Sequence, residues 1–432
     1  MINWRKALQV FKIPELRKKI FIVLGLLAIF RIVAVIPVPG VPVESLQALF
    51  AGNQLFGLLD IFSGGGLSNL SIVMLGVGPY ITASIVMQLM TMIVPRLEEM
   101  QKEEGEAGRQ KINQWTRFLT VPLAALQGFA FLNLLQSGGA QGGGLGLIFT
   151  PWQLVVTLLT ITAGTLLLMW LGELITEQGI GNGISLIIFV GIISQLPQTV
   201  TQIFATWTPD LLFTYGMFLA VAVVVIAGVV IVSEGQRKIP VSYARQTRGN
   251  RMAGGVQSHL PLRVNQAGVI PIIFALSVML FPGVLANFFL GAANATVASV
   301  ANYIVSLFQD QLFYGISYFV LVVAFTFFYT QLTFDPNNIA ENVQKQGGFI
   351  PGIRPGKQTE NYLRYVLNRI TLTGALFLGG IAVLPLVVQA FTNISTLTIG
   401  GTALLIVVSV VLETMKQIES QMTMREYEGF LS

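Results

Sequence analysis

The sequence predicts an all-α polytopic membrane protein with ten transmembrane helices. Composition gives the first reason, because 53% of the 432 residues are hydrophobic and only 10% are charged. A soluble globular chain carries about 25% charged residues, so lipid must cover part of this chain's surface. The other two reasons are apolar runs that recur to the end of the chain and basic residues that are confined to alternate loops.

The apolar runs are long enough to cross a hydrocarbon core of about 30 Å. We predict spans at 20–37, 72–94, 115–135, 152–171, 183–205, 211–232, 267–289, 312–332, 370–391 and 396–415. The fifth run is the least regular, because Pro197 and three glutamines interrupt it. No small-residue cleavage site separates the basic start of the chain from the first run, so we expect no removed signal peptide.

The basic residues predict the topology. All but one of the 25 Lys and Arg residues lie before the first span, in the 2–3, 6–7 and 8–9 loops, or in the tail. Loops rich in Lys and Arg stay in the cytoplasm, so both termini are expected there. One span more or fewer would scatter these charges over both faces. The exception is Arg31, which lies within the first span and is expected to snorkel or to pair.

Ten spans divide into five plus five. An odd number of spans in each half makes the second half enter the membrane upside down, and such inverted repeats place a working site near the midplane. We predict an N-terminal half at 1–206 and a C-terminal half at 207–432. The second half contains long cytoplasmic loops at about 234–264 and 336–368, whose length and Gly-Pro-rich rigidity go beyond what topology alone requires. These loops suit ribosomal RNA, an acidic protein or anionic headgroups.

Two shorter features have open readings. The apolar stretch Phe56 to Phe62 is too short to cross the membrane, and a glycine triplet follows it. It is either a short helix that enters the bundle from outside or an amphipathic surface loop, and the pattern alone favours the loop.

Isoleucine pairs four residues apart in spans 2 and 5 share one helix face. They suit a narrow waist, although ordinary helix packing is the default reading.

Six stretches resemble the SecY family in family order. They are SGGGLSN at 63–69, PYITASIVMQL at 79–89, GIGNGIS at 179–185, SEGQRKIPVSYARQ at 233–246, VNQAGVIPIIFA at 264–275 and GGFIPGIRPGKQTENYL at 347–363. The resemblance extends over essentially the whole chain. It implies a protein-conducting channel in the bacterial plasma membrane, which translocates unfolded preproteins and releases apolar segments sideways into lipid.

The resemblance also implies a central pore between the two halves, with residues for its closure. A plug at about 56–67 reverses the preference for a surface loop, and its residues are Phe56, Leu58, Leu59, Ile61, Phe62, Gly64, Gly65 and Gly66. The waist is a pore ring of Ile81, Ile85, Ile184, Ile188, Ile273 and Ile406.

A lateral gate is expected between spans 2 and 7, with spans 3 and 8 beside it. The polar residues near this seam are Gln88, Gln127 and Asn265. They suit either a hydrogen-bonded cluster that closes the gate or local capping.

The implied partners are SecE-like and SecG-like small membrane subunits, the SecA motor ATPase, the ribosome, preprotein signal sequences and membrane lipid. SecA and the ribosome are expected to dock on Arg237, Lys238, Arg245, Arg248, Arg251, Arg354 and Lys357.

The residue inventory argues against other functions. The chain has no cysteine, a single histidine (His259) and no GxxxxGK[ST] phosphate loop. We therefore expect no enzyme activity, no metal and no cofactor, and partners must supply the energy. A secondary transporter would place carboxylates or histidines at the midplane, and an intramembrane enzyme would need a nucleophile with its base. The spans offer little of either.

Overall fold

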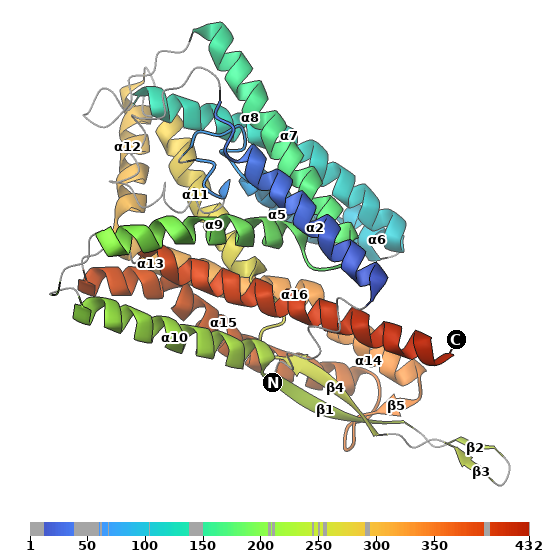
Figure 1. Cartoon of the computed structure of the whole chain (residues 1–432). Helices are drawn as coiled ribbons and strands as arrows, with labels where there is room; N and C mark the ends of the chain where they lie inside the picture. Colours follow the sequence, from blue (N-terminus) through green and yellow to red (C-terminus); the bar gives the residue numbers. More distant parts are fainter. Residues whose placement is uncertain are drawn as a thin grey trace.

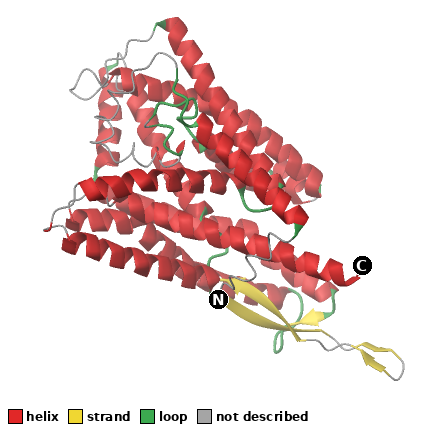
Figure 2. Cartoon of the chain, in the orientation of Figure 1, coloured by secondary structure: helices red, strands yellow, loops and turns green. Residues whose placement is uncertain are grey.

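The structure is a computed structural model, and Figure 1 shows its course. It describes residues 13–38, 60, 63–67, 69–102, 104–137, 150–205, 209, 212–243, 246–248, 251–253, 257–289, 294–392 and 398–431. The described chain is mostly helical, and helices dominate the drawing in Figure 2.

Each predicted span falls on a helix. In chain order these are α2 (Pro14–Val33), α5 (Gly78–Ile93), α7 (Gly105–Ser137), α8 (Pro151–Glu177), α9 (Gly183–Ala205), α10 (Leu212–Glu234), α11 (Ile270–Phe289), α13 (Gln311–Thr333), α15 (Lys357–Thr392) and α16 (Thr398–Leu431).

By length and composition, four of the described helical segments can cross a membrane: Pro151–Glu177, Gly216–Glu234, Gln311–Lys345 and Lys357–Val388. A fifth arises if α5 and the short helix α6 (Pro95–Lys102), bent by 104° at their junction, count as one span. The helical prediction is confirmed, and the number of ten crossings stays a prediction.

The helices that precede residue 206 pack against one another in chain order. Helix α5 contacts α7, α7 contacts α8 and α8 contacts α9, while α2 lies against α8 and α9. Two glycines permit the closest of these approaches. A Cβ placed on Gly183 would lie 1.9 Å from the carbonyl oxygen of Gly172, so the start of α9 can pass α8 here only with glycine. This contact fixes the direction of α9.

The helices that follow residue 212 form a second group. Helix α13 packs against α15, and both α10 and α15 pack against α16, so these helices lie side by side in Figure 1. Helix α11 joins the two groups, because it contacts α13 on one side and α5 and α7 on the other. Helix α16 joins them a second time through α9. The two predicted halves therefore meet along two seams.

One large apolar core is continuous across both groups. Its buried members come from α2, α5, α8 and α9 as well as from α10, α11, α13, α15 and α16. Large apolar side chains are also exposed outside this core, most clearly Phe213, Leu219 and Val224 on α10. Such a surface is expected where lipid replaces water as the surrounding medium.

The two long basic loops form a small sheet, which the sequence analysis did not predict. Strands β1 (Gln236–Tyr243), β4 (Gln257–Arg263) and β5 (Gly348–Phe349) pair antiparallel in the order β4-β1-β5. Strands β2 (Gln246–Arg248) and β3 (Arg251–Ala253) form a separate hairpin at the outer end (Figure 2).

Beneath the three-stranded sheet lies a separate core, which includes Ile239, Val241, Leu262, Ile350 and Leu363. It also includes Ala340 of the short helix α14 (Pro336–Lys345). Strands β1, β4 and β5, helix α14 and the start of α15 are thus parts of one folded unit.

Candidate functional site

The six predicted ring residues meet in the main apolar core. They come from four helices: α5 supplies Ile81 and Ile85, α9 supplies Ile184 and Ile188, α11 supplies Ile273 and α16 supplies Ile406. Five of the six are buried members of the same cluster, and Ile184 packs against it while partly exposed. Residues separated by more than 300 positions therefore belong to one continuous core, in which α5 contacts α11 and α9 contacts α16.

The predicted plug is only partly within the described residues. Phe56, Leu58, Leu59, Ile61 and Phe62 lie outside them, whereas the three glycines are described and buried.

Residues 63–67 form a compact turn. The N–H of Leu67 donates to the Ser63 hydroxyl over 2.9 Å, and the N–H of Gly65 donates to the Asp60 carbonyl over 2.9 Å. Gly64 and Gly65 have φ of +68° and +81°, a conformation in which other residues are strained. The turn is buried, which a surface loop would not be, and the assignment of this segment as a plug stays a prediction.

Two polar side chains that the sequence analysis did not assign to the site hold this turn. Arg31 on α2 donates through Nη1 to the carbonyl oxygen of Gly64. Gln195 on α9 donates through Nε2 to Oδ2 of Asp60 over 3.0 Å. Each could have been noticed in the sequence, since Arg31 lies well inside a predicted apolar span and Gln195 interrupts another. Of the two outcomes expected for Arg31, the structure shows pairing.

The predicted gate residues make hydrogen bonds within their own segments. Gln88 on α5 donates to Ser84 over 3.3 Å, and its other amide atom, Oε1, is buried without a partner. Asn265 donates through Nδ2 to the carbonyl oxygen of Gly268 and accepts at Oδ1 from the N–H of Gly268. Gly268 lies just before α11. Gln127 is half-buried on α7. All three lie in described segments, and no hydrogen bond joins them there, so local capping is the reading that fits Asn265.

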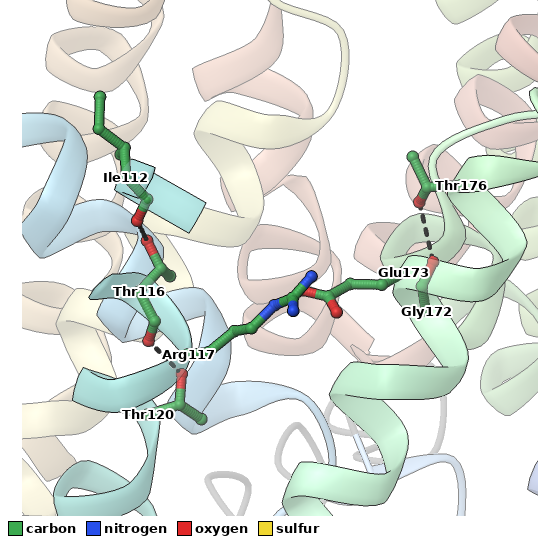
Figure 3. Close-up of polar contacts among 7 residues, drawn as sticks. All are labelled: Ile112, Thr116, Arg117, Thr120, Gly172, Glu173 and Thr176. Carbon is green, nitrogen blue, oxygen red and sulfur yellow. Dashed lines mark hydrogen bonds and ion pairs between the residues drawn. The ribbon is translucent and has the colours of Figure 1, made fainter. Parts of the chain in front are cut away.

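A further polar contact connects α7 and α8, as Figure 3 shows. Arg117 on α7 pairs with Glu173 on α8, with 2.8 Å between Nε and Oε1. The threonines drawn beside this pair donate to carbonyls of their own helices, as Thr176 does to Gly172. An exposed pair of this kind contributes roughly 0–1 kcal/mol. It joins α7 to α8. Among the described residues, no group of three or more His, Asp or Glu could hold a metal ion.

The predicted docking residues lie on the sheet unit. Arg237 and Lys238 are exposed on β1, and Arg248 lies opposite Arg251 across the β2–β3 hairpin. Arg245 lies outside the described residues.

Arg354 and Lys357 are exposed in the segment that joins β5 to α15. The backbone of Arg354 is fixed, because its carbonyl accepts a 3.0 Å hydrogen bond from the buried hydroxyl of Thr359. The pairing of β1 with β5 places this segment beside the first basic loop.

These features define a multi-pass helical membrane protein with one apolar core that is continuous across two helical groups. The SecY family model matches residues 71–415. The protein translocase subunit SecY of Mycobacterium bovis is 45% identical over 433 residues, covering 96% of this chain and 97% of the relative. That of Streptomyces galbus is 44% identical over 432 residues, covering 98% of each. The chain belongs to the SecY family, which confirms the resemblance.

Solved structures with the same fold are more distant in sequence. A structure described as a protein conducting channel has a TM-score of 0.61 at 20% identity, covering 92% of this chain and 90% of that chain. Sec61 in a canine ribosome–channel complex has a TM-score of 0.58, also at 20% identity and with the same coverage. These likenesses establish the fold of the described helices.

Proposed function

We propose that this chain is the channel subunit of a Sec-type protein translocase in a bacterial plasma membrane. It passes unfolded preproteins across the membrane and releases apolar segments sideways into lipid. The observation that carries the proposal is that six isoleucines from four helices belong to, or pack against, the one core that is continuous across the two helical groups. The relatives' description as protein translocase subunits supports the same function.

The ring suits a channel that must hold back ions while it admits many different side chains. Apolar walls at a narrow waist offer an ion nothing in place of its hydration shell, so the waist stays dry. Isoleucine is branched at Cβ and therefore stiff, yet it has no polar atom that would bind a passing chain. Such a ring makes no covalent change to its substrate, so the proposed activity is transport and not catalysis.

The lateral gate is assigned to the seam where α11 packs against α5 and α7. The hydrogen bonds of Gln88 and Asn265 support this assignment, because both stay within one segment. An unpaired amide in lipid is costly, so a seam that opens repeatedly should break few polar bonds. Separating α11 from α5 leaves both of these bonds in place.

The basic sheet unit is assigned to the cytoplasmic partners. Arg354 presents a planar guanidinium from a segment that Pro351 and Pro355 restrict and Thr359 anchors. We assign the SecA motor and the ribosome to this surface, and SecE-like and SecG-like subunits to the lipid-facing side. Both termini are then cytoplasmic, as the positions of the basic residues indicate.

Reconstitution tests the proposal. The chain is purified with its small co-purifying subunits, inserted in vesicles and given a preprotein, the motor ATPase and ATP. The expected result is preprotein that becomes resistant to added protease, with none protected when the signal sequence is deleted. Vesicles that protect no preprotein, although they bind the motor, would exclude the channel function.

A further inference from the structure

A charged residue lies inside the helix bundle with a single segment as its partner. Arg31 occupies the last turn of α2, and the residues around it in the sequence are apolar. A charge in a membrane span is costly, so such residues pair with one another or with backbone carbonyls. The partner of Arg31 is the carbonyl oxygen of Gly64, and the guanidinium also attracts the carboxylate of Asp60. The positive charge is therefore compensated by Gly64 and Asp60.

The same segment is held from a second helix. Gln195 on α9 donates to the Asp60 carboxylate over 3.0 Å and approaches the Asp60 carbonyl at 3.4 Å. Helices α2 and α9 pack against each other, so the two donors reach residues 60–67 from adjoining helices. Backbone shape contributes as well. A Cβ on Gly64 would lie 2.6 Å from the ring of Phe30 and 3.1 Å from Cα of Gly191. Only glycine lets the turn seat between α2 and α9.

We propose that Arg31 and Gln195 are positioning residues that latch Asp60 and residues 63–67 in the closed channel. The inference rests on the proposed function, because it takes this segment as the plug. If the segment leaves, Arg31 loses the carbonyl and the carboxylate that compensate its charge in an apolar setting, and Asp60 loses the Gln195 donor. Both losses favour the seated position. The latch opposes displacement of the plug until a translocating chain takes its place.

A cysteine reporter tests the latch without any substrate. The chain has no cysteine, and the side chain of Leu67 at the end of the turn is 1% exposed. In purified channels, Leu67→Cys should react slowly with a polar thiol reagent. Arg31→Met and Gln195→Leu should each accelerate this reaction by about tenfold, and the double variant should accelerate it further. Arg31→Lys keeps the charge and a donor, so it should restore most of the protection.

The matched control is Ile32→Ala, which changes the next residue on α2, whose side chain is 66% exposed. It should leave the reaction rate unchanged. The latch is wrong if Gln195→Leu and Arg31→Met, folded and assembled with their small subunits, both leave the reporter as protected as in the parent. Gln195→Leu alone decides the question if Arg31→Met does not assemble. Translocation by the reporter parent is measured separately. Loss of transport in that parent contradicts the proposed function, whereas unchanged thiol rates in a transporting parent contradict only the latch.

Discussion

Replacing two ring isoleucines with asparagine should make the resting channel leak ions. The side chains of Ile81 and Ile188 are 4% and 0% exposed, so each new amide would start in an apolar environment. A buried polar group without a partner costs about 1–3 kcal/mol, and water is the available partner at a waist. For two positions this amounts to about 2–6 kcal/mol in favour of a hydrated waist. At about 1.4 kcal/mol per tenfold change, the hydrated population should rise by about 30-fold to 10⁴-fold.

The assay is conductance of purified channels in planar bilayers without substrate. Ile175→Asn is the matched control, because Ile175 is buried in the same core but is not a ring residue. The control should lower stability without raising conductance, whereas the double ring variant should raise conductance and accept weaker signal sequences. Ile406→Asn alone should give a smaller increase. If the double variant has the same resting ion conductance as the parent, Ile81 and Ile188 are ordinary packing residues and the ring assignment is wrong.

The remaining predictions concern topology, docking and the gate. Val300→Cys should react with an impermeant thiol reagent outside intact cells and Lys345→Cys should not; the reverse would overturn the span assignment. Arg354→Glu should lower preprotein protection at least tenfold while co-purification with the small subunits persists, and normal transport would exclude a docking role. Gln88→Leu removes a buried oxygen without a partner, so it should stabilise the closed seam by about 1 kcal/mol and raise the hydrophobicity needed for membrane insertion. Asn265→Leu should lower that threshold, because it removes the bonds to Gly268 at the start of α11. A graded series of test segments measures both.

The sequence predicted the helices well because long apolar runs have few other stable structures in a membrane. The predicted first and last residues of the helices were less accurate. The first span was predicted at 20–37, whereas α2 spans Pro14–Val33. Hydropathy detects only the apolar part of a helix, and α2 includes a basic first part that starts with proline, a favoured first residue. Leu16 in that part is buried against Met422 of α16. Such a long-range contact cannot be recognised from the local hydropathy pattern.

The strands of the basic loops were missed for a different reason. The side chains of Ile239 and Val241 are buried while Pro240 between them is exposed, which is the alternation of a half-buried strand. The alternation is short and lies among charged residues, so the sequence indicated a charged cytoplasmic loop and no strand. Strand β1 is also stabilised by residues more than 100 positions away, at β5. Pairing between distant segments cannot be seen in either segment alone.

The polar groups of the candidate site show where sequence reasoning reached its limit. Gln88, Asn265 and Arg31 are similar signals in the sequence, each a polar residue in or beside an apolar run. The first two bond to neighbours within four residues, whereas Arg31 bonds to Gly64 on a separate segment. Under the proposed function, the difference agrees with what the gate and the plug must each do. A gate seam separates helices, so polar bonds across it would have to be broken in lipid at every opening. A plug must stay seated against thermal motion, so polar bonds from neighbouring helices stabilise its closed position. The same residue types therefore permit motion where their bonds are local and oppose it where their bonds join separate segments.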